Sequence, residues 1–265
     1  MDIAFFTKLA LSFIIGSVWV SLSTLAAEKY GSKVGGLIGG LPSTVVVALL
    51  FIGLTQSPQA ASSATTVIPL VQGFNGVFLV AYLYWIKKGL WSGLLAALAV
   101  WAVQAGLLLA VGLKHLWISL AGWLVLAAGC ILIVEKAMNI PSRQGIRVRH
   151  TRSQVFVRAF FGGTVIAFAV LMGKLGGPVF GGLFATFPAM FLSTLVITYH
   201  DEGADFSRAV AKSLMISGEV NIVLYAVLAR FLYKEWGLAL GTTVALAICL
   251  GSGYLLYLYM KSRLD

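Results

Sequence analysis

The sequence predicts an all-α, polytopic membrane protein of about nine transmembrane helices, arranged as two inverted four-helix repeats joined by a linker helix. Hydrophobic residues make up 60% of the 265 residues and charged residues 11%, which is more apolar surface than a soluble core buries. Apolar stretches of about 20 residues, enough to cross a ~30 Å hydrocarbon layer, follow one another along the chain. The third observation is an internal repeat.

The repeat runs without a gap at an offset of 146 residues. It matches Gly35, Gly36, Leu37, Pro42 and Asn75 with Gly181, Gly182, Leu183, Pro188 and Asn221. A proline and a mid-membrane asparagine in one register indicate a duplication. We therefore expect a first membrane repeat at 1–115, a linker helix and basic cytoplasmic loop at 116–146, and a second repeat at 147–265. Duplicated membrane proteins often place their working site between the copies.

The predicted spans are 5–27, 33–55, 62–86, 90–112, 116–135, 154–173, 179–199, 206–230 and 236–260. The first span has a weakly cleavage-like end, but it matches a segment inside the second repeat, so we expect a permanent helix. The fifth span has no match and is the predicted linker. Each repeat has four predicted spans, and one linker span lies between them. With this odd extra crossing, the second repeat enters the membrane from the opposite side.

Charge gives the orientation. Of the 19 lysines and arginines, five fall on one face, namely Lys8, Lys114, Lys174, Arg230 and Lys234, and the other fourteen on the opposite face. The richer face is expected to be cytoplasmic. This places the N-terminus outside and the C-terminus inside, in the inner membrane of a bacterium or archaeon.

The basic loop at 136–153 carries much of the net charge of +10. It lacks aromatic residues for base stacking and any recognition motif, so we expect no nucleic-acid partner. A topology-setting loop or weak attraction to anionic membrane lipids explains it better. Cysteines and histidines have no metal-ligand spacing, so no metal, cofactor or enzyme activity is expected. Glycine-rich spans would allow a homodimer, and equally close packing within one chain.

Glu219 is the first candidate functional residue, near the centre of the eighth span. An ionisable residue at that depth costs ~2.5–3.5 kcal/mol on insertion scales and usually faces the bundle interior. We predict that it exchanges a proton or holds a cation as a coupling residue. The alternatives are a protonated carboxyl bonded to a neighbouring helix or a partner for Lys212. Its repeat counterpart is Gly73.

Asn75, Asn221 and Gln72 form a second signal, a polar belt at mid-depth in the third and eighth spans. An asparagine side chain donates and accepts hydrogen bonds at once, which suits solute recognition and helix pairing equally. Arg158, about one turn inside the sixth span, could hold a lipid phosphate.

Pro42 and Pro188 are the third signal, each following a glycine-rich segment, GGLIGGLP and GGLFATFP. Proline removes a backbone donor and disfavours helix just before it. The second and seventh spans are therefore candidates for broken helices whose free backbone groups bind solute; an ordinary kink is the alternative. Hydroxyls of Ser43, Thr44 and Thr186 lie on the same segments.

Each half, at these two segments, resembles the small four-helix bacterial membrane proteins of the GlpM type, which carry a similar proline after a glycine-rich stretch. The resemblance implies the architecture and no particular chemistry.

These patterns favour a secondary-type transporter of a small solute, proton- or cation-coupled, working by alternating access between the repeats. The first alternative is a lipid or polyprenyl-phosphate flippase, favoured by the basic face and Arg158. An ion channel and a non-catalytic membrane assembly factor are further alternatives.

Overall fold

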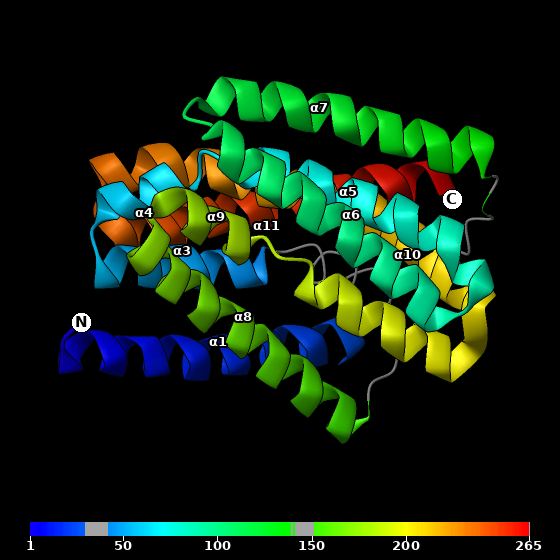
Figure 1. Ribbon diagram of the computed structural model, residues 1–265, viewed down its shortest axis with the longest axis horizontal. Helices are drawn as coiled ribbons and strands as arrows, with labels where there is room; N and C mark the ends of the chain where they lie inside the picture. The colour runs from blue at the N-terminus through cyan, green and yellow to red at the C-terminus, as the bar shows by residue number, and fades with distance from the viewer. Residues whose placement is uncertain (30–41, 139, 141–150, 265) are drawn as a thin grey trace.

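Helices make up every element in the part of the chain that the structure describes. The structure is a computed structural model and describes residues 1–29, 42–138, 140 and 151–264; the side chains of 27–29, 137, 216–219 and 255–264 also lie outside the description (Figure 1). The elements are α1 (Ile3–Lys29), α3 (Ser43–Thr55), α4 (Pro58–Ala64), α5 (Ile68–Trp85), η1 (Ile86–Lys88), α6 (Leu90–Val111), α7 (Leu116–Leu132), the π-helix η2 (Ile133–Ala137), α8 (Arg152–Gly176), α9 (Pro178–Ala185), α10 (Ala189–Glu235) and α11 (Gly237–Leu264). Over these residues the expectation of an all-α chain is confirmed.

Seven helical stretches among the described residues are long and apolar enough to cross a membrane. They are Ile3–Ala26, Pro58–Lys88, Leu90–Val111, Leu116–Lys136, Arg152–Gly176, Pro178–Glu235 and Gly237–Tyr254. The predicted seventh and eighth spans both fall within the 58-residue stretch. Of the predicted second span, only the 13-residue α3 is described. The chain therefore fits an integral membrane protein, and the count of nine spans stays a prediction.

Helix α10 contains a sharp turn at Gly203, whose backbone is not helical (φ 84°, ψ −174°). A positive φ is the conformation that glycine adopts at little cost. The turn divides α10 into a first arm, 189–202, and a second arm, 204–235. Across it, the Ser207 hydroxyl donates to the carbonyl of Leu195 (3.1 Å) and the Thr198 hydroxyl lies 3.2 Å from Ser207 Oγ. The two arms are therefore held against each other beside the turn.

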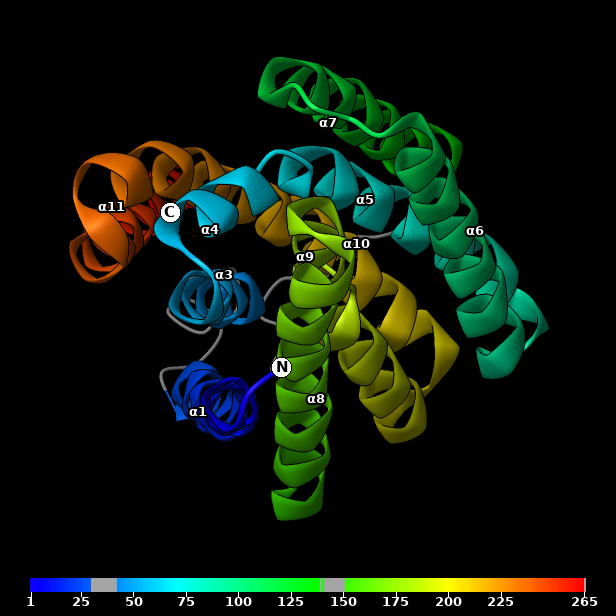
Figure 2. The ribbon, with the colours of Figure 1, turned by 60° about the vertical axis from the view of Figure 1, so that its left-hand side comes forward.

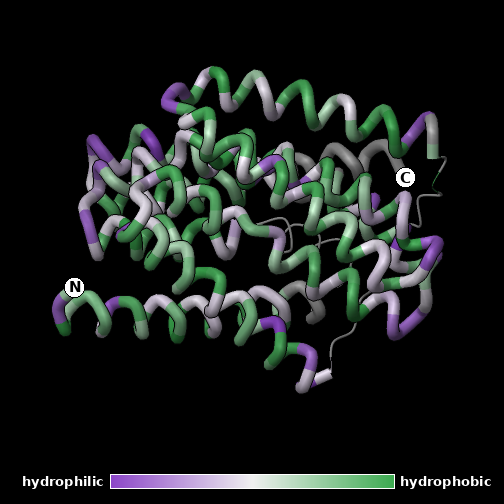
Figure 3. Tube along the Cα trace, viewed as in Figure 1, coloured by the Kyte–Doolittle hydropathy of each residue, from purple (hydrophilic) through white to green (hydrophobic). Residues whose placement is uncertain are grey.

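The hydropathy of the chain matches a membrane setting. Figure 3 shows polar residues gathered toward the two ends of the bundle, with mostly apolar stretches between them. Many large apolar side chains are exposed on the outer helices, such as Leu107 on α6 and Val125 on α7, which is 71% exposed. In water such a surface would be costly, whereas in a bilayer it faces lipid tails.

Helices α1 and α8, which hold equivalent places in the two repeats, lie against each other and run in opposite directions (Figure 1). The contacts at their crossing are reciprocal. Gly16 faces Ile166, and Gly162 faces Val20. Gly162 is the repeat counterpart of Gly16, and Ile166 is that of Val20. The glycine of each helix therefore packs against the branched side chain of the other at equivalent positions. We call this crossing the α1–α8 seam.

The other helices lie around the seam in an ordered way. Helix α5 packs against α6, α7 and α10, while α3 packs against α1 and α8. Figure 2 shows α7, the predicted linker, at the edge of the molecule, lying on α5 and distant from α1. Its far end is tied to the second repeat, because buried Lys212 of α10 lies 3.0 Å from Glu135 and donates to the carbonyl of Ile140 (2.9 Å).

Candidate functional site

The candidate site is built around a break in the helical chain between α9 and α10. Helix α9 ends at Ala185 and α10 begins at Ala189, with Pro188 (φ −75°, ψ 42°) just before it. Proline has no N–H to continue the helix, and Thr186 and Phe187 instead donate to Leu183 and Phe184 at the tighter i−3 spacing. The structure thus has an interruption in the predicted seventh span, at the proline.

Asn75 of α5 contacts this break from the first repeat. Its Nδ2 donates to the carbonyl of Thr186 (2.9 Å) and to Oε1 of Gln72 (3.2 Å), while its Oδ1 accepts from Nε1 of Trp101 on α6 (3.0 Å). Asn75 is 3% exposed. The amide therefore satisfies a carbonyl freed by the break, which in an apolar interior would otherwise be costly.

Three of the predicted residues, Gln72, Asn75 and Thr186, are thus brought together. We call this set, with Trp101 and the break at 186–188, the break cluster. Aromatic rings complete it: Phe187 lies edge-on to Trp101 (ring centroids 5.1 Å apart) and to Phe161 of α8 (6.4 Å). Trp101 was not among the predicted site residues. The signal that could have identified it was an indole N–H deep in the fourth span, which needs an acceptor when buried.

Asn221 lies on the second arm of α10 and contacts a different helix. Its Oδ1 accepts from the hydroxyl of Ser252 on α11 (3.0 Å). Both repeat-related asparagines therefore join the third helix of their repeat to the fourth, α5 to α6 and α10 to α11. The contact to the break, from Asn75 to Thr186, is additional.

Pro42 precedes α3 in nearly the conformation that Pro188 has before α10, with φ −75° and ψ 52°. Pro42 is buried, and Ser43 and Thr44 are half-buried. The glycine-rich approach to Pro42, residues 35–40, lies outside the described residues. The two prolines therefore begin equivalent helices in the two repeats, and a complete break is described in the second.

Glu219 is on the second arm of α10, and its side chain lies outside the described residues. Its suggested partner Lys212 is engaged elsewhere, with Glu135 and the Ile140 carbonyl. In the described part of the chain no group of three or more histidine, cysteine, aspartate or glutamate side chains could hold a metal ion.

Arg158 of α8 contacts the first arm of α10, which begins directly after the break. Its Nη1 donates to Oγ1 of Thr194 (2.6 Å), and its Nη2 lies 3.9 Å from the sulfur of Met190. Its Nε is buried and has no hydrogen-bond partner among the described residues. No ion pair joins it to a described carboxylate.

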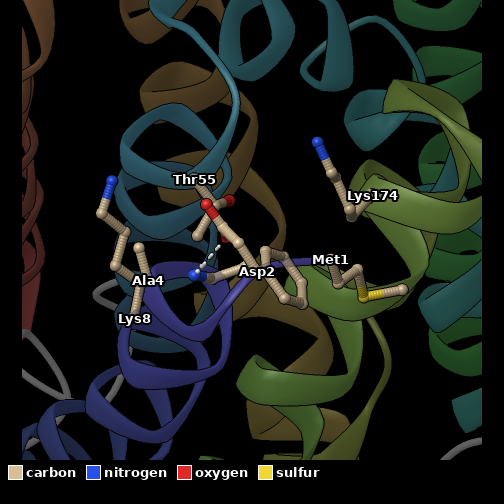
Figure 4. A pocket seen from close by; sticks show the side chains of 7 residues that line it. Met1, Asp2, Ala4, Lys8, Thr55 and Lys174 are labelled. Carbon is tan, nitrogen blue, oxygen red and sulfur yellow. Dashed lines mark hydrogen bonds between the residues drawn. The ribbon is translucent and has the colours of Figure 1, made fainter.

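A pocket of about 290 Å³ lies at one end of the bundle, where α1 begins and α3 and α8 end. It is lined by Met1, Asp2, Ala4, Phe5, Lys8, Thr55 and Lys174 (Figure 4). Lys8 donates to the carbonyl of Leu54 (2.7 Å). None of the predicted site residues lines this pocket, so the pocket is separate from the break cluster.

Comparison with known protein families identifies the repeat independently. One family, described as "Protein of unknown function (DUF3147)", matches twice, at residues 9–114 and 155–261. The chain belongs to the DUF3147 family. The two matches start 146 residues apart, at 9 and 155, so each half of the chain is one copy of the DUF3147 unit. The resemblance of each half to GlpM-type proteins stays a prediction. No curated protein and no solved structure matched the chain.

Proposed function

We propose that this DUF3147 protein is a secondary-type transporter of a small solute, with its pathway between the two repeats. The observation that carries the proposal is the break at 186–188, whose Thr186 carbonyl is bonded by Asn75 of the other repeat. In many transporters, discontinuous helices supply backbone groups for binding near the middle of the membrane. A polar contact between the halves is also a place where a solute can compete for hydrogen bonds.

Inverted repeats are the second part of the proposal. The opposite directions of α1 and α8 and their reciprocal glycine contacts support a pseudo-twofold relation between the halves. Two halves related in this way can exchange conformations, so that a site between them opens first to one side and then to the other. The seam would be the contact about which they rock.

We assign Glu219 the role of proton or cation coupling. Asn75, Gln72, Thr186 and the backbone at Pro188 would contact the solute from one side of the pathway. Asn221 of the second repeat, with Pro42, Ser43 and Thr44 of the first, would contact it from the side related to this one by the repeat. Their equivalent places in the repeat support this assignment.

The test begins with thermal unfolding of the purified protein in detergent against metabolites, ions and pH values. A ligand at 100 times its dissociation constant adds ~2.7 kcal/mol to the stability of the folded state. The solute found in this way is then followed into proteoliposomes. We expect Glu219→Gln to abolish solute accumulation driven by a proton or cation gradient, and Asn221→Ala to raise the solute's KM.

The matched control is Thr164→Val on α8. The Thr164 hydroxyl is exposed and, among the described residues, bonds only the carbonyl of Phe160 in its own helix (2.8 Å). It should transport at the wild-type rate. Unchanged transport in both Glu219→Gln and Asn221→Ala would exclude the proposed pathway. Channel-like currents that saturate only at high ion concentration would favour a pore instead.

Lipid translocation is the second candidate, favoured by Arg158, a membrane-embedded cation without a described carboxylate partner. Its test is the rate at which fluorescent phosphatidylglycerol in proteoliposomes becomes accessible to an impermeant quencher. Acceleration by the wild-type protein, lost in Arg158→Gln, would favour this function over solute transport.

A further inference from the structure

Arg158 has an unusual hydrogen-bonding state for a membrane-embedded arginine. A charged side chain in a span normally pairs with an acid or with backbone carbonyls, because hydrocarbon does not solvate it. Here the described partners are one hydroxyl, Thr194 Oγ1 at 2.6 Å, and one sulfur, Met190 Sδ at 3.9 Å. Neither carries a negative charge, so the guanidinium charge is not neutralised by its described partners.

One edge of the guanidinium is buried without a strong partner among the described residues. Nη1 donates to Thr194, whereas the described residues offer Nε no partner and Nη2 only the distant sulfur. Nε and Nη2 are the two nitrogens that form parallel hydrogen bonds to the two oxygens of a carboxylate or phosphate. Thr194 itself is held by its own hydroxyl, which donates to the carbonyl of Met190 (2.8 Å). Thr194 therefore orients Arg158 so that its bidentate edge is not used by the described residues.

The position of Arg158 is also informative. It lies one helical turn before Gly162, whose surface faces both Val20 of α1 and Met190 of α10. Arg158 is thus beside the α1–α8 seam and close to the break at 186–188. Its repeat counterpart is Ser12, a buried hydroxyl bonded to the carbonyl of Leu9 (2.7 Å). The charge therefore belongs to the second repeat alone.

We propose that the Nε–Nη2 edge of Arg158 binds an oxyanion, a carboxylate or phosphate group, with Thr194 as the positioning residue. This inference rests on the proposed function and names its substrate class as anionic. A free anion and a lipid head group present the same oxygens, so the experiment separates these two sources.

The experiment measures thermal unfolding of the full chain in a neutral detergent. One arm adds inorganic phosphate or succinate, against sodium chloride at matched ionic strength. The other adds phosphatidylglycerol, against phosphatidylcholine. We expect at least one anionic probe to raise Tm and Arg158→Gln to weaken its binding about tenfold or more, as loss of a charge-assisted bidentate contact predicts. Arg158→Lys should bind more weakly than wild type, because an ammonium cannot offer two parallel donors.

The matched control is Arg230→Gln. Arg230 is a half-buried arginine of α10 that donates to a threonine hydroxyl, Thr66 Oγ1 (2.8 Å), and to the Ser62 carbonyl (3.4 Å). This variant makes the same change in net charge and should bind the probe like the wild type. If Arg158→Gln does not fold, Arg158→Lys and Thr194→Val take its place in the test. Each should unfold in a normal transition and bind the anionic probe more weakly than the wild type.

Three results would overturn the inference. One is that no probe, free or lipid, raises Tm above its matched control. Another is that Arg158→Gln, Arg158→Lys and Thr194→Val bind the probe as wild type does. Glu28 is the one carboxylate of α1, the helix packed against α8, and its side chain lies outside the described residues. Glu28→Gln therefore tests whether Arg158 has this carboxylate as a partner. Equal loss of stability in Glu28→Gln and Arg158→Gln, with no anion effect, would assign Arg158 to a structural ion pair and also overturn the inference.

The probe that raises Tm identifies whether the bound oxyanion comes from a soluble anion or from a lipid head group. A shift with phosphate or succinate identifies a soluble anion, and a shift with phosphatidylglycerol alone identifies a lipid. Uptake of labelled phosphate or succinate into proteoliposomes then separates the two proposals. Binding without any uptake supports the oxyanion site and contradicts the transporter. Uptake that Arg158→Gln leaves unchanged supports the transporter and contradicts the oxyanion site.

Discussion

At the scale of single residues, Asn75 shows what sequence alone can and cannot predict. Its depth in the third span and its repeat counterpart Asn221 marked it as a candidate. Its partners could not be predicted, because Trp101 and Thr186 are 26 and 111 residues away along the chain. Such contacts depend on how helices pack, which hydrophobic periodicity does not specify when spans are apolar on all sides.

Replacing Asn75 tests these contacts directly. Asn75→Ala leaves the buried Trp101 N–H and the Thr186 carbonyl without their partner, and we expect a loss of about 1–3 kcal/mol in stability. Trp101→Phe should lose less, because it leaves Asn75 its other contacts. A double-mutant cycle in detergent, with Thr164→Val as control, would measure the coupling between the two side chains. Strictly additive effects would mean that Trp101 and Asn75 are not bonded.

At the scale of helices, the repeat predicted where the chain would bend, and the prolines explain why. Pro188 begins α10 and Pro42 begins α3 with closely similar backbone angles. At Gly203 both repeats leave the helix, but by different means. Gly203 has a positive φ, whereas its counterpart Ser57 is extended between α3 and α4 and caps α4 by accepting from the amide of Ala60 (3.1 Å). Local chemistry at one turn therefore differs while the helices on either side correspond.

The α1–α8 seam gives a sharp prediction at this scale. A methyl group added at Gly163 would meet the hydroxyl of Ser17, which can rotate away, and the backbone carbonyl of Phe13, which cannot move without shifting α1. We expect Gly163→Ala to cost about 1–3 kcal/mol, as overpacking does. Gly106→Ala on α6 is the control, because its added methyl meets nothing within 4 Å.

Gly106→Ala should be neutral or stabilising by up to about 1 kcal/mol, since alanine favours helix over glycine. Unfolding of both variants in detergent measures the difference. Equal stability of Gly163→Ala and Gly106→Ala would mean that the seam is not closely packed in the membrane.

At the scale of the whole molecule, the two-repeat organisation is the best-supported feature. Gly16 and Gly162, matched by their spacing in the sequence, meet each other's neighbours in space. The family match starts at residues 9 and 155, at the same offset. Span limits were less certain because glycine and proline divide apolar stretches: Pro188 separates α9 from α10. The function of the halves could not be predicted to the same degree, since it depends on a few polar contacts between them.

Membrane orientation is testable at this scale. The charge distribution predicts an outside N-terminus, an outside Lys114 and a cytoplasmic basic loop around Arg147. Periplasmic and cytoplasmic reporters fused after Lys114 and after Arg147 should therefore be active on opposite sides. The same side for both fusions would mean that α7 does not cross the membrane, and the inverted relation of the repeats would be lost with it.

The reciprocal glycine contacts at the α1–α8 seam constrain the ancestry of the protein. In a reciprocal contact each partner supplies the same glycine and the same branched side chain, so two identical chains could form it. Because α1 and α8 run in opposite directions, two such chains would have to be inserted into the membrane with opposite orientations. The lysines and arginines of a protein made of one half would then have to be balanced between the two membrane faces, so that the chain could insert in either orientation. Fusion through α7 removes that requirement, and each half is then free to acquire a charge, such as Arg158, that its counterpart lacks.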